Sequence, residues 1–161
     1  MNFKITDNRT AIVSAVESAV GKTLEEIGLR AMGYAIMNAP AGTPESTGII
    51  GYKGGSLRQS IDYKIVENAV HIGTNITSKV SHYDKDGNKT GETDEPYGLY
   101  VELGTGVYAD NGQGRKNPWL WTDKNGKKHW TKGIKPTHFL RNSISEHMDE
   151  YKHIVIDGLK I

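Results

Sequence analysis

The chain of 161 residues contains no cysteine, so disulfides and thiolate metal sites are excluded. A chain without cysteine also fits folding in a reducing cytosol. An excess of one charge is missing as well, because 20 Lys and Arg face 19 Asp and Glu and leave a formal net charge of +1. No global field therefore steers the chain toward nucleic acid or an anionic membrane, and any such contact has to be local.

Long apolar runs are also absent. Residues 1–7 lack the apolar core of a signal peptide, and no later run approaches the length of a membrane span. We therefore expect a protein that is made and kept soluble inside a cell, with no membrane partner. The length fits a single domain over residues 1–161. The 19 glycines and a mean hydropathy of −0.55 suggest long exposed loops, expected near residues 41–55, 75–95 and 107–117.

Two segments have the spacing of amphipathic helices. From about Thr10, apolar residues recur at three- and four-residue steps and predict one long helix that ends before Pro40. From Pro136 the same spacing predicts a C-terminal helix, with Pro136 in its first turn and Gly158 at its end. A short helix with Ser56 as its cap is predicted between them.

Alternating apolar residues predict the strands. Alternation on both sides of Glu67-Asn68 predicts a hairpin over residues 62–74, and residues 3–5 predict a short N-terminal strand. Tryptophans on either side of residues 123–126 predict a second hairpin. The expected fold class is α+β, in which a long N-terminal helix packs on an antiparallel β-sheet with a β-hairpin extension and a C-terminal helix.

A further strand is predicted at residues 100–103, where Glu102 stands among apolar neighbours before the turn 104–106. An ionised group that faces a core or an interface costs several kcal/mol unless it is paired or hydrogen-bonded, so Glu102 needs a partner. The amides of the turn, Arg58 or a basic residue of an adjoining subunit are the candidates. We favour a structural carboxylate that fixes the turn over an intersubunit pair.

Several fragments imitate catalytic or ligand motifs without completing them. Gly21-Lys22-Thr23 matches the end of a phosphate-binding loop, but it falls inside the predicted first helix and Val16 replaces the required earlier glycine. Asp84, Asp86, Asn88 and Glu95 match four EF-hand ligand spacings, but Lys89 stands where the loop requires glycine. No Gly-x-Ser-x-Gly elbow is present. We therefore expect no catalytic residue, no metal, no cofactor and no enzymatic activity.

Two alternatives of another class stay open. His147 and Glu150 share a helix face and would suit a metal-dependent hydrolase, although a third ligand is not evident. Lysines surround the tryptophans, a composition that suits a DNA-contacting module through phosphate charge and base stacking. They are Lys124, Lys127, Lys128, Lys132 and Lys135. Whether these lysines form a basic stripe on one face does not follow from the sequence.

Four motifs occur in order along the chain. They are Ala39-Pro40, Gly55-Ser56-Leu57-Arg58-Gln59-Ser60-Ile61, Tyr100-Val101-Glu102-Leu103-Gly104-Thr105 and Pro136-Thr137-His138-Phe139-Leu140-Arg141. Together they resemble the HK97 gp10-like family of tailed-phage neck and tail proteins over nearly the whole chain. The most specific part is the Glu-Leu-Gly-Thr segment followed by Pro-x-x-Phe-Leu. The loops after Pro40 and over residues 75–95 are longer than is usual in that family.

The resemblance implies a structural protein of the phage or prophage virion that acts in tail completion or head-tail joining, with tail terminator or minor tail protein as the alternative. Copies would form a homo-oligomeric ring at the head-tail junction, assembled in the host bacterial cytoplasm. The implied partners are a connector or stopper, the tail terminator and the tail tube, with at most non-specific contact to passing DNA.

The same resemblance marks a structural or assembly motif within the chain. Its residues are Leu57, Arg58, Ser60, Tyr100, Glu102, Gly104, Thr105, Pro136, Phe139 and Leu140. The tryptophans Trp119, Trp121 and Trp130 are expected either in the core or as anchors of a subunit interface, because large aromatic side chains are common in both places.

Overall fold

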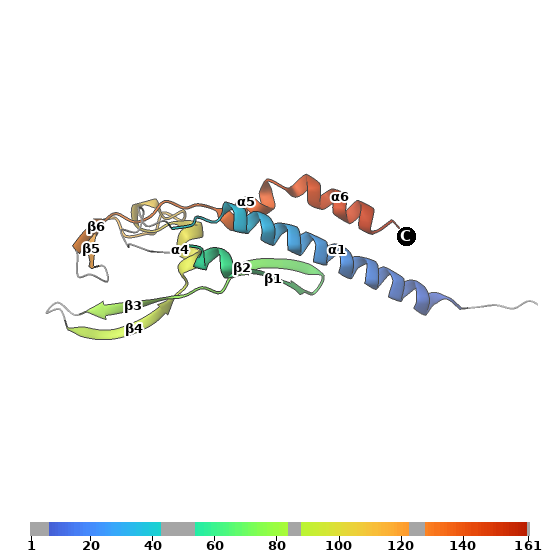
Figure 1. Ribbon diagram of the computed structural model, residues 1–161, viewed down its shortest axis with the longest axis horizontal. Coiled ribbons are helices and arrows are strands. Elements are labelled where there is room, and N and C mark those ends of the chain that lie inside the picture. The colour runs from blue at the N-terminus through green and yellow to red at the C-terminus, as the bar shows by residue number, and fades with distance from the viewer. Residues whose placement is uncertain (1–6, 43–53, 84–87, 123–127, 161) are drawn as a thin grey trace, which may run out of the picture.

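The computed structural model describes residues 7–42, 54–83, 88–122 and 128–160. Its central element is α1 (Arg9–Asn38), a helix of 30 residues that runs through most of the length of the molecule (Figure 1). The predicted first helix is thus confirmed. The strand predicted over residues 3–5 and most of the loop predicted near residues 41–55 lie outside the described residues.

Elements from both halves of the chain pack on α1 and build three layers. The helices α5 (Phe139–Ser145) and α6 (Met148–Gly158) lie along one side of α1, and the hairpin of β1 (Ile61–Val66) and β2 (Ala69–Thr74) lies along the other (Figure 1). The predicted α+β class is therefore confirmed. None of the helices that the structure describes has the length and apolar character needed to cross a membrane.

Small residues let α1 approach its neighbours closely. Ala31, Ala35 and Ala39 have no exposed surface. A Cβ atom at Gly28 would lie 2.3 Å from Cδ2 of Tyr63, so the tyrosine ring packs directly on the helix backbone. The start of α1 is different, because every residue from 9 to 18 is exposed. The predicted apolar stripe of α1 is therefore covered only in the second half of the helix.

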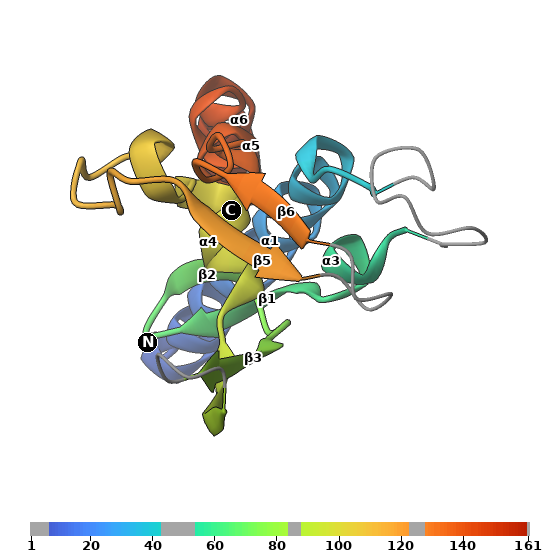
Figure 2. The same ribbon diagram turned by 90° about the vertical axis from the view of Figure 1, so that its left-hand side faces the viewer.

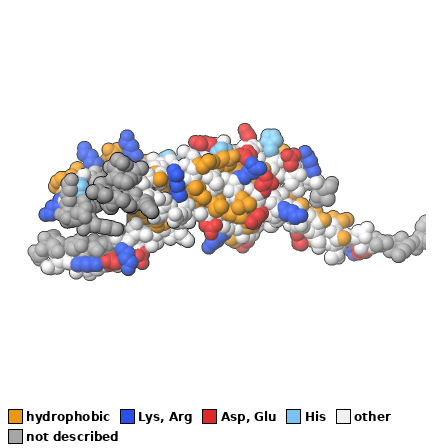
Figure 3. All heavy atoms as spheres, in the orientation of Figure 1, with side chains coloured by type: hydrophobic (Ala, Val, Ile, Leu, Met, Phe, Trp, Pro, Cys, Tyr) orange, Lys and Arg blue, Asp and Glu red, His pale blue; other side chains and the backbone are white. Residues whose placement is uncertain are grey.

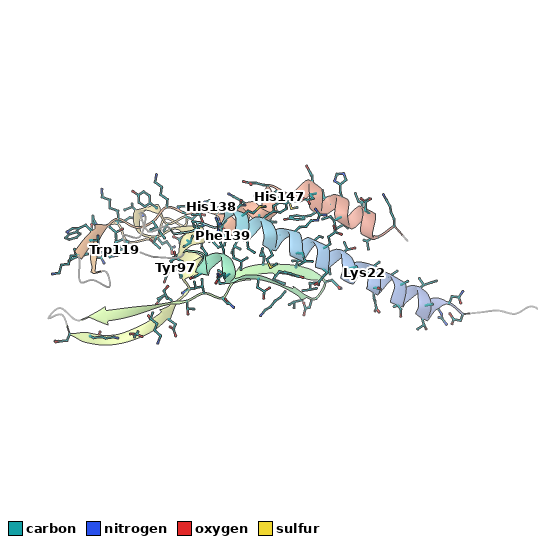
Figure 4. The ribbon with its side chains drawn as sticks, viewed as in Figure 1. Lys22, Tyr97, Trp119, His138, Phe139 and His147 are labelled. Carbon is teal, nitrogen blue, oxygen red and sulfur yellow. The ribbon has the colours of Figure 1, made fainter. Side chains whose placement is uncertain are left out.

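The core lies where α1 meets two short helices and the start of α5. These helices are α3 (Ser56–Gln59) and α4 (Tyr97–Leu103). The buried cluster comprises Ala35, Ala39, Leu57, Ile61, Val101 and Phe139. Figure 4 places Phe139 at this meeting point, close to the C-terminal end of α1. Each element contributes few residues, so the core is small relative to the length of the molecule.

The strands form hairpins, and each pair is a separate two-stranded antiparallel sheet in the part of the chain that the structure describes. Glu67 and Asn68, with φ of 50° and 61°, form the tight turn between β1 and β2, as predicted. The tryptophan hairpin is also present, as β5 (Trp119–Thr122) and β6 (Lys128–Thr131). Residues 75–95, expected as an exposed excursion, include a further hairpin.

The further hairpin consists of β3 (Ser78–Tyr83) and β4 (Lys89–Glu95). It lies at the same end of the molecule as β5 and β6, and the start of α1 lies at the opposite end (Figure 1). Figure 2 looks at this end and shows β5 and β6 in front, with α5 and α6 above them and β3 below. The two hairpins therefore project separately from the core.

The prediction of a strand at residues 100–103 is wrong. These residues form the last turn of α4, which begins after Pro96, and the carbonyl of Pro96 accepts the N–H groups of Leu99 and Tyr100. The buried residues Gly98, Val101 and Glu102 follow helical spacing. Four residues of apolar alternation are too few to separate a period of two from a period of 3.6.

The C-terminal helix also differs from the prediction. Pro136 precedes the first helical residue, Phe139, and two helices replace one because the chain turns between α5 and α6. Gly158 does end α6, as predicted. The cap assigned to Ser56 is wrong too, because Gly55 occupies the N-cap of α3 with a φ of 117° and Ser56 is the first helical residue.

Candidate functional site

Glu102 is the centre of the joint between α4 and α5. It has 7% of its surface exposed, and its Oε2 and Oε1 atoms accept the backbone N–H groups of Leu140 at 2.8 Å and Arg141 at 3.0 Å. These N–H groups belong to the first turn of α5, where no intrahelical acceptor is available. His138, the N-cap residue, has a φ of 53° and makes no side-chain cap bond. Glu102 therefore supplies from another helix the cap that α5 lacks.

Two of the partners predicted for Glu102 are wrong, and its structural role differs from the one we favoured, because the carboxylate caps α5 and does not fix the turn 104–106. The carboxylate binds neither the amides of residues 104–106 nor Arg58. Arg58 instead donates its Nε–H to the carbonyl of Ala39 at 2.8 Å, directly after the last turn of α1. Each charged side chain thus hydrogen-bonds free backbone groups at the end of a helix that is distant in sequence. The two contacts connect α3 to α1 and α4 to α5.

The turn after α4 is held by the chain that returns from β6. Thr105 donates its N–H to the carbonyl of Ile134 at 2.9 Å, and its Oγ1 accepts the N–H of Ile134 at 3.0 Å. Gly104, with a φ of 73°, passes so close to Pro136 that a Cβ atom would lie 2.8 Å from the proline ring. A side chain at this position would be strained twice, by its φ and by the contact.

The structure thus brings most of the predicted motif into one joint. Leu57 and Phe139 lie in the core, and Leu140 packs against its edge. Ser60 hydrogen-bonds the hydroxyl of Thr74 and holds the start of β1 to the end of β2. Tyr100 is the exception, because its hydroxyl donates to Glu95 of β4, which raises the pKa of the tyrosine.

A cleft of about 660 Å³ opens beside this joint, between α4 and residues 109–114. At its rim, Arg141 donates to Asp110 at 2.8 Å, and Nε2 of His138 lies 3.7 Å from the same carboxylate. Nδ1 of His138 is buried and has no hydrogen-bond partner among the described residues. Asp110 was not predicted as part of the site, since nothing in the spacing of the sequence places it next to residues 138–141. Its carboxylate is already held by Arg141, so the pair orders the loop.

His147 and Glu150, the candidate metal ligands, connect α6 to α1 through contacts with Arg30 and Tyr34, and we call these four residues the lock between α1 and α6. Oε1 of Glu150 accepts from Arg30 at 2.6 Å, and its Oε2 accepts from the hydroxyl of Tyr34 at 2.7 Å. The ring of His147, which is labelled in Figure 4, stacks on the ring of Tyr34. The two ring centroids are 3.4 Å apart. Tyr151 donates to the carbonyl of Ser143, and burial raises its pKa to about 12.

This lock accounts for both residues without a metal. The hydrogen bond from Tyr34, with the neighbouring Arg30, holds the pKa of Glu150 below its ordinary value. Both of its carboxylate oxygens are occupied by protein donors. Across the described ranges, no group of three or more His, Cys, Asp or Glu side chains is arranged to hold a metal ion.

The remaining fragments that imitate ligand motifs lie where a structural role explains them. Gly21-Lys22-Thr23 lies inside α1, and the hydroxyl of Thr23 donates to the carbonyl of Ala19 at 2.8 Å. The EF-hand-like segment falls partly on residues 84–87, which lie outside the described residues. Gly106, with a φ of 61°, lies against the carbonyl of Lys132, so the turn 104–106 serves chain packing.

The tryptophan hairpin lies away from the core at the end of the molecule (Figure 4). Trp130 is 73% exposed, so of its two expected places, core or subunit interface, the core is excluded in the single chain. Trp119 is half-buried, and the guanidinium of Arg115 lies 5.5 Å from its ring centroid. The structure does not describe the side chain of Trp121.

No protein-family model, curated protein or solved structure matches the chain.

Proposed function

We propose that this protein is a structural component of the head-tail junction of a tailed phage or prophage, where copies assemble into a ring during tail completion or head-tail joining. The partners would be the connector or stopper, the tail terminator and the tail tube of the same virion. The mechanism is stoichiometric: each copy contributes binding surfaces, and no substrate is turned over.

The observation that carries the proposal is the uncovered start of α1. Ile12, Val13 and Val16 are 61%, 53% and 40% exposed and lie on one side of a helical stretch, residues 9–18, in which every residue is exposed. A free helix of this length is marginal in water, since tertiary packing supplies most helical stability. An apolar face on such a helix is typical of a surface that a partner covers.

A second group of exposed apolar residues, on α6, supports the same interpretation. Met148, Val155 and Ile156 of α6 are 46%, 38% and 58% exposed. A molecule with a small core and several uncovered apolar faces gains stability when copies pack side by side, because apolar area is removed from water. The motif around Glu102 would keep the layers at a fixed angle, which a closed ring requires of each subunit.

The sequence motifs supply the phage assignment, and the geometry supports an assembly role. Most of the residues that resemble the HK97 gp10-like family lie where α1, α3, α4 and α5 meet, consistent with motifs that preserve a shape. The alternative assignment, a tail terminator or minor tail protein, would use the same surfaces with a different neighbour.

Deletion of the gene from the phage or prophage that encodes it tests the proposal. We expect filled heads that are separate from tails by electron microscopy, and joined particles when the wild-type gene is supplied in trans. Tails of normal length favour head-tail joining, whereas overlong tails favour the terminator alternative. Normal infectious particles from the deletion strain would refute a role in the virion.

A further inference from the structure

One face of the β5–β6 hairpin brings an indole and two lysines together. Successive residues of a strand point to opposite faces, so Lys128 and Trp130 share a face, and Lys132 continues the alternation just beyond β6. Leu120 pairs with Trp130 across the hairpin and is 43% exposed. Trp130, Thr131 and Lys132 line one shallow hollow together with Pro118. We call Leu120, Lys128, Trp130 and Lys132 the lysine–tryptophan face.

The sequence on either side of this face is basic for a chain that is nearly neutral. Residues 104–137 carry seven Lys and Arg and two Asp, whereas the whole chain has a net charge of +1. Within the described part of this stretch, Asp110 is the acidic residue, and Arg141 already pairs with it. Figure 3 shows Lys and Arg side chains on the end that carries β5 and β6.

The cations of the lysine–tryptophan face remain available to a ligand. Lys128 and Lys132 are exposed, and neither pairs with an acidic group among the residues that the structure describes. Trp130 exposes most of its ring, although tryptophan is a highly buried residue on average. Exposure of an indole ring to water is unfavourable, so a ligand that covers Trp130 and pairs with the two lysines would gain binding free energy.

We propose that the lysine–tryptophan face binds single-stranded nucleic acid. The ring of Trp130 stacks on an unpaired base, and Lys128 and Lys132 contact the phosphates on either side of it. Alternate residues of a strand lie about 7 Å apart, so the two ammonium groups flank the indole along the direction of the strand. Base–aromatic stacking tolerates any base and combines with charge in proteins that bind single strands.

Two other ligands fit these observations less well. Lysine is depleted in the buried centre of protein–protein interfaces, so a protein partner explains the tryptophan but not its two neighbours. Duplex DNA hides the faces of its bases inside the stack, so it explains the lysines but not the exposed indole. The inference does not rest on the phage assignment, because it uses another end of the molecule and needs no other subunit.

The test measures binding of the full chain to labelled oligothymidine by fluorescence anisotropy between about 50 and 200 mM salt. Trp130→Ala should weaken binding about tenfold, and Trp130→Phe should retain most of it because phenylalanine still stacks. Lys128→Gln with Lys132→Gln should lower the slope of log affinity against log salt by about 1.4, since each phosphate contact with a single strand contributes about 0.7.

The matched control is the pair Lys22→Gln and Lys64→Gln, which removes the same charge from α1 and β1, and should leave binding unchanged. Lys22 lies far from the hairpin (Figure 4). Circular dichroism should show an unchanged fold for all variants, because the substituted side chains are exposed. Absence of binding at low salt, tighter binding to the matched duplex, or equal binding of polyglutamate with no effect of Trp130→Ala would each overturn the inference.

Discussion

At the scale of single residues, Glu102 shows how a buried charge can be satisfied by the backbone. The carboxylate takes two N–H groups that the first turn of α5 leaves open. The negative charge also faces the positive end of the dipoles of that turn. A neutral cap on α5 itself is not available, because the backbone of His138 is left-handed and its side chain points elsewhere. Stability of the joint should therefore depend on the charge at position 102.

We expect Glu102→Gln to destabilise the fold by about 2 kcal/mol, because the amide offers one acceptor oxygen where the carboxylate offers two and carries no charge. Urea denaturation at neutral pH measures the change. Glu146→Gln is the matched control: Glu146 is exposed at the far end of α5, and its substitution should change stability by less than about 0.5 kcal/mol. Equal effects of the two substitutions would contradict the capping role.

At the scale of elements, the sequence correctly predicted those helices and turns whose structure depends on local residue patterns. The long helix α1, the β1–β2 turn at Glu67-Asn68 and the tryptophan hairpin all follow from periodicity or turn residues, and all are present. The strand at residues 100–103 was wrong because it covered too few residues for its period to be measured. Short segments take their structure from what they pack against, here α5 and the chain that returns from β6.

The candidate site was less predictable than the fold for a related reason. The sequence identified Glu102 as a group in need of a partner and offered Arg58 as one candidate. The groups that these two side chains bind lie 38 and 19 residues away and are backbone atoms, which carry no residue signature. The lock of Glu150 with Arg30 and Tyr34 was missed for the same cause. Contacts between distant segments depend on packing angles that no local spacing encodes.

The lock between α1 and α6 should be sensitive to acid. The folded-state pKa of Glu150 lies below the ordinary value of 4.5, so its stabilising effect is present above that value. The effect is lost as the pH falls through the lower folded-state pKa. We expect Glu150→Gln to lower the melting temperature at neutral pH, and the gap from wild type to close as the pH falls below about 4.5.

Melting curves followed by circular dichroism over the acid range measure this gap. Asp149→Asn is the control, because Asp149 lies on the same helix, its side chain is 88% exposed, and its ion pair is with the neighbouring Lys152. Its substitution should change the melting temperature little at any pH. A gap for Glu150→Gln that stays constant from neutral to acid pH would contradict the lock.

At the scale of the whole molecule, the two ends differ in chemistry. One end carries the β5–β6 hairpin with Lys128 and Lys132, and the other carries the apolar start of α1 (Figure 1). In the packed centre between them, the charged side chains of Glu102 and Arg58 bind backbone groups and so connect α1, α3, α4 and α5. A subunit built in this way can present two different surfaces at a fixed distance, and each surface can be altered without disturbing the centre.

We expect Ile12→Glu with Val16→Glu to abolish assembly of the protein, because two carboxylates would have to be buried in the contact that covers α1. Self-association of the purified chain should weaken about tenfold or more by analytical ultracentrifugation, and the gene should fail to restore joined particles to a deletion strain. Ser18→Glu, on the opposite side of the same exposed stretch, adds a charge outside the apolar face and should restore them. Since all three positions are exposed in the single chain, the melting temperature and helicity should stay close to wild type. Full complementation by the double variant would exclude the start of α1 as an assembly surface.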